Sequence, residues 1–169
     1  MQILAGRYKG ITIYTSTKIP YRPTKSRVRK SVFDKLQSFQ FHSVLDLFAG
    51  SGIMGFEAAS RGGSEITFIE KHTLAFLELK RNAKKFSYTE FNFKRANVLN
   101  TINRFGKYDL IFADPPYGTF NLEAMAKTIL EHLNKNGKFV LECEKSQKPF
   151  SDAEYADYGD TRILTWTNK

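Results

Sequence analysis

The fold is decided by one stretch of the chain, VLDLFAGSGIMG, at residues 44–55. Its apolar start predicts a buried strand, and the residues that follow its glycines favour a helix. Gly50, Gly52 and Gly55 mark the connection, where they let the backbone turn tightly and approach a ligand beside a helix N-terminus. The stretch therefore predicts a strand, a ligand-binding loop and a helix in succession.

Strands and helices alternate in the sequence on the C-terminal side of this stretch. Further strands are expected at residues 65–70, 91–96, 108–113 and 138–143, and helices at residues 53–61, 72–86 and 121–133. Such alternation predicts an α/β fold, in which a mostly parallel sheet is covered by helices on both faces. The end differs, because Gly159-Asp160 between two apolar runs indicates an antiparallel hairpin.

The N-terminal part precedes this pattern and carries most of the charge. A hairpin is expected around Gly6–Gly10, and a helix over residues 25–38 with Thr24 as its N-cap. Residues 1–45 hold nine Lys or Arg but one acid, while the chain as a whole has a net charge of +9. We expect one domain, in which residues 1–42 form a basic extension of a core at residues 43–169.

A basic segment of this kind favours a polyanionic partner, because neutralising phosphates releases counterions. The alternative is a solvated basic face that keeps the protein in solution. The residues predicted to contact nucleic acid are Arg7, Lys9, Arg22, Thr24, Arg27 and Arg29.

The sequence Asp114-Pro115-Pro116-Tyr117 directly follows the apolar run at residues 108–113. Its prolines lack N–H groups and hold the segment extended, so it offers carbonyl acceptors between a carboxylate and an aromatic ring. This arrangement suits a nucleobase that stacks on Tyr117 while acceptors hold its amino group. The alternative is that the prolines only end the strand.

Two carboxylates beside the glycine loop point to the cofactor. Glu70 ends the strand after the loop and is placed to accept from ribose hydroxyls. NAD and S-adenosylmethionine both fit a glycine loop with such an acid. Asp46 favours S-adenosylmethionine, because it can accept from a cofactor ammonium group that NAD lacks. NAD chemistry would also leave the Asp114 tetrapeptide without a task.

Several motifs together resemble one family. They are Asp46 with Phe48-Ala49-Gly50-Ser51-Gly52, Glu70, Asp114-Pro115-Pro116-Tyr117, Arg22-Pro23-Thr24-x-x-Arg27-Val28-Arg29, Ile3-Leu4-Ala5-Gly6-x-x-x-Gly10 and Tyr158-Gly159-Asp160-Thr161. The chain resembles the RsmD family of class I, Rossmann-like methyltransferases, whose members methylate the exocyclic N2 of a guanine in bacterial 16S rRNA. The resemblance implies S-adenosyl-L-methionine as cofactor, held by Asp46, the loop residues Phe48, Ala49, Gly50, Ser51 and Gly52, and Glu70. It also implies that Asn97 lies by the adenine and that the substrate is an assembling small ribosomal subunit.

Other readings stay open at this point. A DNA adenine-N6 methyltransferase would use the same tetrapeptide, although no segment is left over for a target-recognition domain. A non-catalytic RNA-binding or assembly protein on this fold is a second alternative. The three histidines and the single Cys143 lack metal-ligand spacing, so no metal is expected. We expect a cytoplasmic protein, because the sequence contains neither a membrane-spanning stretch nor a secretory signal. We also expect a monomer, since no exposed coiled-coil pattern is present.

Overall fold

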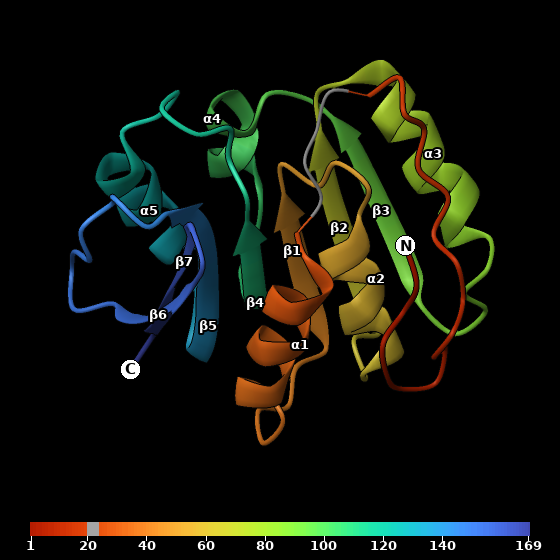
Figure 1. Ribbon diagram of the computed structural model, residues 1–169, viewed down its shortest axis with the longest axis horizontal. Helices are drawn as coiled ribbons and strands as arrows, with labels where there is room; N and C mark the ends of the chain where they lie inside the picture. Colours follow the sequence, from red (N-terminus) through yellow and green to blue (C-terminus); the bar gives the residue numbers. More distant parts are fainter. Residues whose placement is uncertain (20–23) are drawn as a thin grey trace.

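A computed structural model describes residues 1–19 and 24–169 (Figure 1). Its strands form one seven-stranded sheet in the order β3-β2-β1-β4-β5-β7-β6. The strands are β1 (Ser43–Leu47), β2 (Glu65–Glu70), β3 (Glu90–Arg95), β4 (Tyr108–Ala113), β5 (Leu133–Glu144), β6 (Glu154–Tyr158) and β7 (Thr161–Thr167). The helices are α1 (Ser26–Lys35), α2 (Ile53–Ser60), α3 (Thr73–Ala83), α4 (Val98–Thr101) and α5 (Leu122–Leu130), with a 3-10 turn η1 (Ile102–Arg104).

Strands β1 to β5 run parallel, and β7 pairs antiparallel with both β5 and β6. This confirms the predicted mostly parallel sheet and its C-terminal hairpin. The chain leaves β1 toward β2 and β3, then returns to place β4 on the other side of β1. The strand order reverses between β1 and β4, and open sheets of this kind bind ligands at the carboxyl ends of such strands.

Each face of the sheet has its own apolar core. On one face, α1, α2 and α3 contribute Val32, Phe56 and Leu79 among others to a cluster of buried side chains. On the other face, Val98 of α4 and Ile129 of α5 belong to a second buried cluster. Figure 1 shows α1 and α2 in front of the central strands. Because helices cover both faces of the sheet, the ends of its strands remain accessible to ligands.

The N-terminal segment packs into the first of these cores rather than forming a separate unit. Ile3 and Ile13 are almost fully buried there. The expected hairpin is present: Gln2 and Thr12 form an antiparallel bridge, Ile3 N–H donates to the carbonyl of Ile11 at 3.0 Å, and Ile13 N–H donates to the carbonyl of Met1 at 2.7 Å. The same segment also bonds to side chains of α2. Helix α1 is shorter than predicted and starts after Lys25, so Thr24 is not its N-cap.

Three other elements differ from the sequence prediction. Strand β5 begins at Leu133, because Asn136 with a φ of 62° makes an irregularity inside the strand instead of a turn before it. Helix α4 and η1 were not expected. Within the described residues, no helix is long and apolar enough to cross a membrane.

Candidate active site

A cavity of about 280 Å³ opens at the carboxyl ends of β1 and β4, where the strand order reverses. It brings together most of the residues predicted from the sequence. Its lining comprises Thr24, Asp46, Phe48, Ala49, Gly50, Ser51, Ile53, Met54, Asp114, Pro115, Pro116, Tyr117 and Glu142. We call this space the cofactor cavity. The glycine loop and the tetrapeptide, far apart in the chain, therefore face one space.

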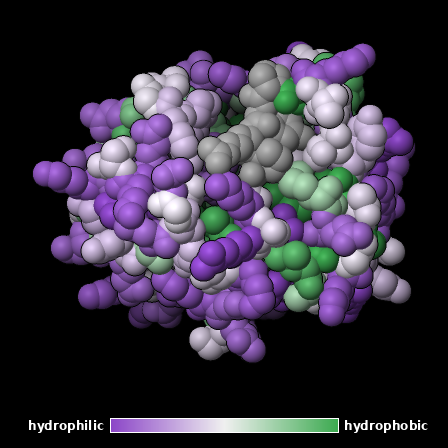
Figure 2. Space-filling view, viewed as in Figure 1, coloured by the Kyte–Doolittle hydropathy of each residue, from purple (hydrophilic) through white to green (hydrophobic). Residues whose placement is uncertain are grey.

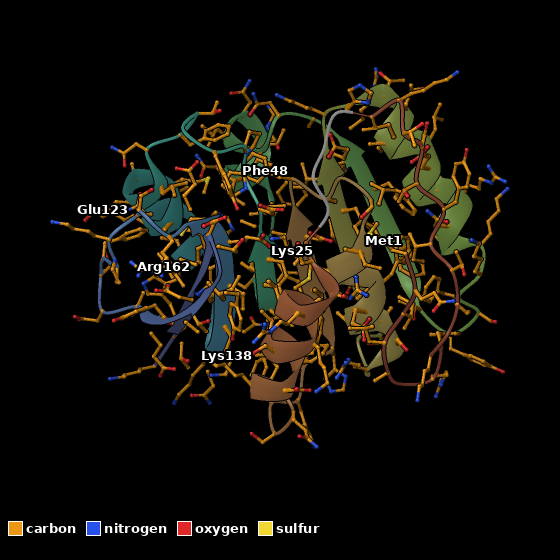
Figure 3. The ribbon with its side chains drawn as sticks, in the orientation of Figure 1. Met1, Lys25, Phe48, Glu123, Lys138 and Arg162 are labelled. Carbon is orange, nitrogen blue, oxygen red and sulfur yellow. The ribbon has the colours of Figure 1, made fainter. Side chains whose placement is uncertain are left out.

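The loop after β1 is fixed by backbone hydrogen bonds. Ala49 N–H donates to the carbonyl of Ile69 on β2 at 3.0 Å, and Gly52 N–H donates to the carbonyl of Ala49 at 2.7 Å. Phe48 has a φ of 57°, and its ring lies 5.3 Å from that of Phe120. In Figure 3, Phe48 lies at the edge of the sheet beyond the end of β1. These bonds hold the loop backbone at the cavity wall.

Gly52 faces the protein interior rather than the cavity. Its φ is 73°, and an added Cβ would lie 2.3 Å from Cδ2 of Leu79 and 2.8 Å from Cε2 of Phe56. The residue thus serves the tight turn and the close packing of α2, both of which need glycine. Gly52 does not line the cofactor cavity, so its contact with a cofactor stays a prediction.

Asp46 is the most buried carboxyl group of the cavity, with only 4% of its surface exposed. Burial raises its pKa to about 8, although the Gly55 N–H, which donates to Oδ2 at 2.9 Å, opposes this shift. Nearby Glu70 raises the pKa further. A buried carboxyl group with this pKa is stabilised as an anion by a bound cation, so it fits the ammonium group of S-adenosylmethionine.

Glu70 and Asn97 do not line the cofactor cavity. Glu70 instead holds the loop, because its carboxylate accepts from Gly50 N–H at 2.8 Å and from His72 N–H at 2.7 Å. Asn97 is exposed and caps α4, since its Oδ1 accepts from Leu99 N–H at 3.1 Å. The ribose and adenine contacts expected of these two residues stay predictions.

The tetrapeptide forms a partition. Pro115, Pro116 and Tyr117 line the cofactor cavity on one side and a second cavity of about 190 Å³ on the other. Pro115 is buried, whereas the Tyr117 ring is 40% exposed. An exposed ring beside backbone acceptors is suited to stacking on a base.

Glu142 of β5 is a cavity residue that the sequence analysis did not identify. It lines both cavities, and Thr24 donates from Oγ1 to its Oε2 at 2.9 Å. An acid inside an apolar strand gives no local signal of a site. Only the pairing of Ala113 with Leu141, which places Glu142 next to Asp114, could have revealed it.

The predicted nucleic-acid contacts divide into three groups. Thr24 lines the cofactor cavity. Helix α1 begins two residues after Thr24, and the exposed Arg27 lies in its first turn. Arg7 and Lys9 are also exposed. Arg7 lies at the C-terminal end of α2, because its N–H donates to the carbonyl of Ser60, the last residue of that helix. Arg22 lies outside the described residues.

The prediction for Arg29 is wrong. Its side chain is 2% exposed, so it cannot reach a phosphate in this structure. One of its terminal nitrogens donates to the carbonyl of Gln2 at 2.7 Å, and its Nε lies 3.4 Å from Oε2 of Glu57. Glu57 is fully buried and also accepts from Leu4 N–H and Ala5 N–H. Arg29 therefore joins the N-terminal segment to α2.

The surface around α1 is mostly hydrophilic. Figure 2 shows purple residues over most of the face that carries α1 and α2, with separate small apolar patches. In the part of the chain that the structure describes, no cluster of His, Cys, Asp and Glu side chains could hold a metal ion.

This fold, with an acid in β1, a glycine loop after β1 and a proline-stiffened acceptor segment after β4, defines a class I S-adenosylmethionine-dependent methyltransferase. A family model described as "Conserved hypothetical protein 95" matches residues 1–165. The chain belongs to this family, the RsmD family.

Named relatives agree with this assignment. The chain is 35% identical over 151 residues to "Ribosomal RNA small subunit methyltransferase D" of Buchnera aphidicola, covering 86% of this chain and 78% of the relative. A solved "putative methyltransferase yhhF" from Escherichia coli superposes with a TM-score of 0.86 at 23% identity, covering 100% of this chain and 98% of that one. The 16S rRNA N2 methyltransferase RsmC of Thermus thermophilus, solved with AdoMet and guanosine, shares the fold with a TM-score of 0.73 at 16% identity, covering 90% and 45%.

Proposed function

We propose that this protein methylates the exocyclic N2 of a guanine in bacterial 16S rRNA, using S-adenosyl-L-methionine. The observation that carries the proposal is the shared cavity, in which Asp46 and the glycine loop face Asp114, Pro115 and Tyr117. A cofactor site and an acceptor-lined base site thus adjoin one another. Membership of the RsmD family supports rRNA as the polymer and N2 as the acceptor atom.

In this proposal the cofactor lies between Asp46 and the glycine loop. The Asp46 carboxylate binds its ammonium group, and Glu70 and Asn97 take its ribose and adenine. When bound, S-adenosylmethionine supplies an electrophilic methyl group on a sulfonium. Asp46 is only 4% exposed, so little water reaches the charged contact, which strengthens it.

Asp114 and Pro115 act on the amino group of guanine. Its lone pair is delocalised into the ring, so N2 is a poor nucleophile. The Asp114 carboxylate and the Pro115 carbonyl accept its two hydrogens, which favours a pyramidal nitrogen with its lone pair toward the methyl group. Most of the acceleration then comes from positioning and electrostatics. N2 gains the methyl group and loses one proton, which the Asp114 carboxylate accepts.

The remaining residues hold the RNA. Tyr117 stacks on the base, which must be unpaired or flipped out of its stack. Arg27 contacts the RNA backbone near the cavity, and Arg7 and Lys9 bind phosphates farther away. Arg22, which lies outside the described residues, also contacts the RNA, whereas Thr24 donates its hydroxyl to Glu142 in the cavity lining. Residues 1–42 thus serve as the RNA-binding extension of the core. The substrate is an assembling small subunit, and the protein acts in the cytoplasm as a monomer that needs no metal.

The direct test is product identification. The protein is incubated with labelled S-adenosylmethionine and either small-subunit particles lacking the modification or duplex DNA, and the labelled nucleoside is identified. N2-methylguanosine from the particles is the expected result. N6-methyladenosine as the only product would instead identify the adenine-N6 enzyme, which uses the same acceptors.

A variant tests the proposed mechanism. Asp114→Ala is expected to lower the methylation rate roughly 10²- to 10⁴-fold, because it removes an acceptor and the proton acceptor together. Cofactor affinity, measured by calorimetry, and particle binding should stay at the wild-type level. A variant that still transfers methyl groups at the wild-type rate would contradict the mechanism and would mean that the tetrapeptide only ends the strand.

A further inference from the structure

The reaction described above leaves open how the site distinguishes guanine from adenine. Asp114 and Pro115 accept amino hydrogens, which both bases carry. The two bases differ at N1, where guanine has an N–H donor and adenine has a lone-pair acceptor. A second acceptor beside Asp114 would therefore choose between them.

Glu142 stands at that place. Because Ala113, the last residue of β4, pairs with Leu141 of β5, Asp114 directly after β4 and Glu142 within β5 are the next residues toward the same edge of the sheet. Adjacent strands are about 4.8 Å apart, which the N1 and N2 edge of one guanine can span through its hydrogen bonds. Both carboxylates line the cofactor cavity.

Thr24 fixes the Glu142 carboxylate. Its hydroxyl donates to Oε2 at 2.9 Å, and Thr24 itself is 6% exposed. An ionised carboxylate accepts hydrogen bonds and cannot donate them. A carboxylate offers about four acceptor positions, so the bond from Thr24 is compatible with a second one from a base.

We propose that Glu142, oriented by Thr24, is the specificity-determining residue that accepts the N1–H of guanine and excludes adenine from the site. The inference rests on the proposed function and extends it from the amino group to the whole edge of the base. Adenine would place its N1 lone pair against an acceptor-only carboxylate, leaving both groups without a hydrogen. Asp114 would then serve the amino group and Glu142 the base identity.

The test begins with the wild-type protein and needs no variant. The methylated nucleotide is mapped in small-subunit particles, and particles are then assembled from ligated rRNA with guanosine or 2-aminopurine riboside at that position. The analogue keeps the N2 amine but has a lone pair at N1. Guanosine is expected to be preferred roughly ten- to hundredfold in kcat/KM. Equal rates would overturn the proposal.

Glu142→Gln assigns this preference to the residue. Its amide can donate to the N1 of 2-aminopurine, so the kcat/KM ratio of guanosine over 2-aminopurine riboside should fall to within about threefold. We expect this fall to come mainly from slower methylation of guanosine. The missing O6 of the analogue affects both proteins alike. Glu123→Gln is the charge-matched control, because Glu123 lies on α5, away from Phe48 at the cavity edge in Figure 3, and should leave the preference unchanged.

Thr24→Val provides a second variant in case Glu142→Gln does not fold. It removes the hydroxyl that orients Glu142 at little change in volume and should narrow the preference partly, with cofactor affinity unchanged. A preference that stays at the wild-type value in every folded variant of these two positions would refute the role of Glu142. If the wild-type protein makes no N2-methylguanosine at all, the proposed function has failed instead.

Discussion

Asp46 is the residue at which folding stability and ligand binding oppose each other. Its pKa is raised from about 3.8 to about 8 in the folded protein, chiefly by burial. Between these pH values the unfolded chain has lost the proton while the folded chain keeps it. The free energy of unfolding therefore falls as the pH rises from about 4 to about 8.

We expect Asp46→Asn to remove this dependence. Without cofactor, the variant should be more stable than the wild type at pH 8, and the gap should close toward pH 4. Urea unfolding at a series of pH values measures it. The same change should weaken S-adenosylmethionine binding roughly ten- to hundredfold, because a charged acceptor is lost. Wild-type affinity in calorimetry would show that Asp46 does not bind the ammonium group.

Gly52 carries two constraints that a matched pair of substitutions can separate. Gly52→Ala places a Cβ at a φ of 73° and 2.3 Å from Leu79, whereas Gly10→Ala has a φ of 86° and no atom within 4 Å. Both variants pay for the backbone conformation, but only Gly52→Ala adds overpacking. We expect Gly52→Ala to lower the free energy of unfolding by about 1–3 kcal/mol more than Gly10→Ala does. Equal losses in denaturant unfolding would exclude the packing contribution.

Within helix α1, neighbouring arginines have opposite roles. Arg27 is exposed, whereas Arg29 is buried beside the buried Glu57. Arg29→Ala should destabilise the fold by about 1–3 kcal/mol, because it removes the hydrogen bond to the Gln2 carbonyl and one of the two cations beside Glu57, the other being Arg61 at 2.9 Å. Arg27→Ala should leave the melting temperature unchanged and reduce the salt dependence of RNA binding by about one phosphate contact. Thermal unfolding and binding titrations at several salt concentrations distinguish the two. The reverse pattern would contradict the assignment.

The elements differ in how much of them the sequence could predict. Strands β2 and β4 were predicted with their observed bounds, because apolar runs bounded by polar residues define both. Helix α4 has four residues, too few for a periodic pattern. The irregularity at Asn136 resembled a turn, since only pairing with β4 shows that β5 continues through it.

The site was predictable to the extent that its residues follow strands or form motifs. Asp46, the glycine loop and Asp114 were found in this way, and the structure brings them to one cavity. Glu142 escaped, because its role depends on strand register. Arg29 was misassigned because its role also depends on a contact between distant positions: its partner Glu57 is 28 positions away. Its spacing from Val32 and Phe33 was a usable signal, because it places Arg29 on the apolar face of α1.

For the whole molecule, the exposed basic residues predicted to bind RNA lie at two places, Arg7 and Lys9 at one end of α2 and Arg27 toward the other. Arg7 lies beside Ser60 at the last residue of α2, and Arg27 lies near the cavity at the start of that helix. Helix α2 has eight residues and spans about 12 Å. An RNA that contacts both ends must therefore extend well beyond the methylated nucleotide.

This separation predicts a dependence on substrate size. The double variant Arg7→Ala with Lys9→Ala should weaken binding to the small-subunit particle while leaving binding to a short RNA hairpin around the target nucleotide unchanged. Arg27→Ala should weaken both. Titrations at fixed salt measure the effect, since phosphate contacts depend strongly on ionic strength. An equal loss on both RNAs from the double variant would place Arg7 and Lys9 at the target itself.

The position of β7 between β5 and β6 also constrains the order in which the sheet can assemble. Strand β6 precedes β7 in the chain but pairs only with it, so β6 has no place on the sheet until β7 is made. The two strands must join β5 as a preformed hairpin or in immediate succession. Until then β5, which carries Glu142, is an open edge with unpaired backbone groups, and such edges associate with other chains. The strand that carries Glu142 is thus open to association with other chains until the β6–β7 hairpin covers it.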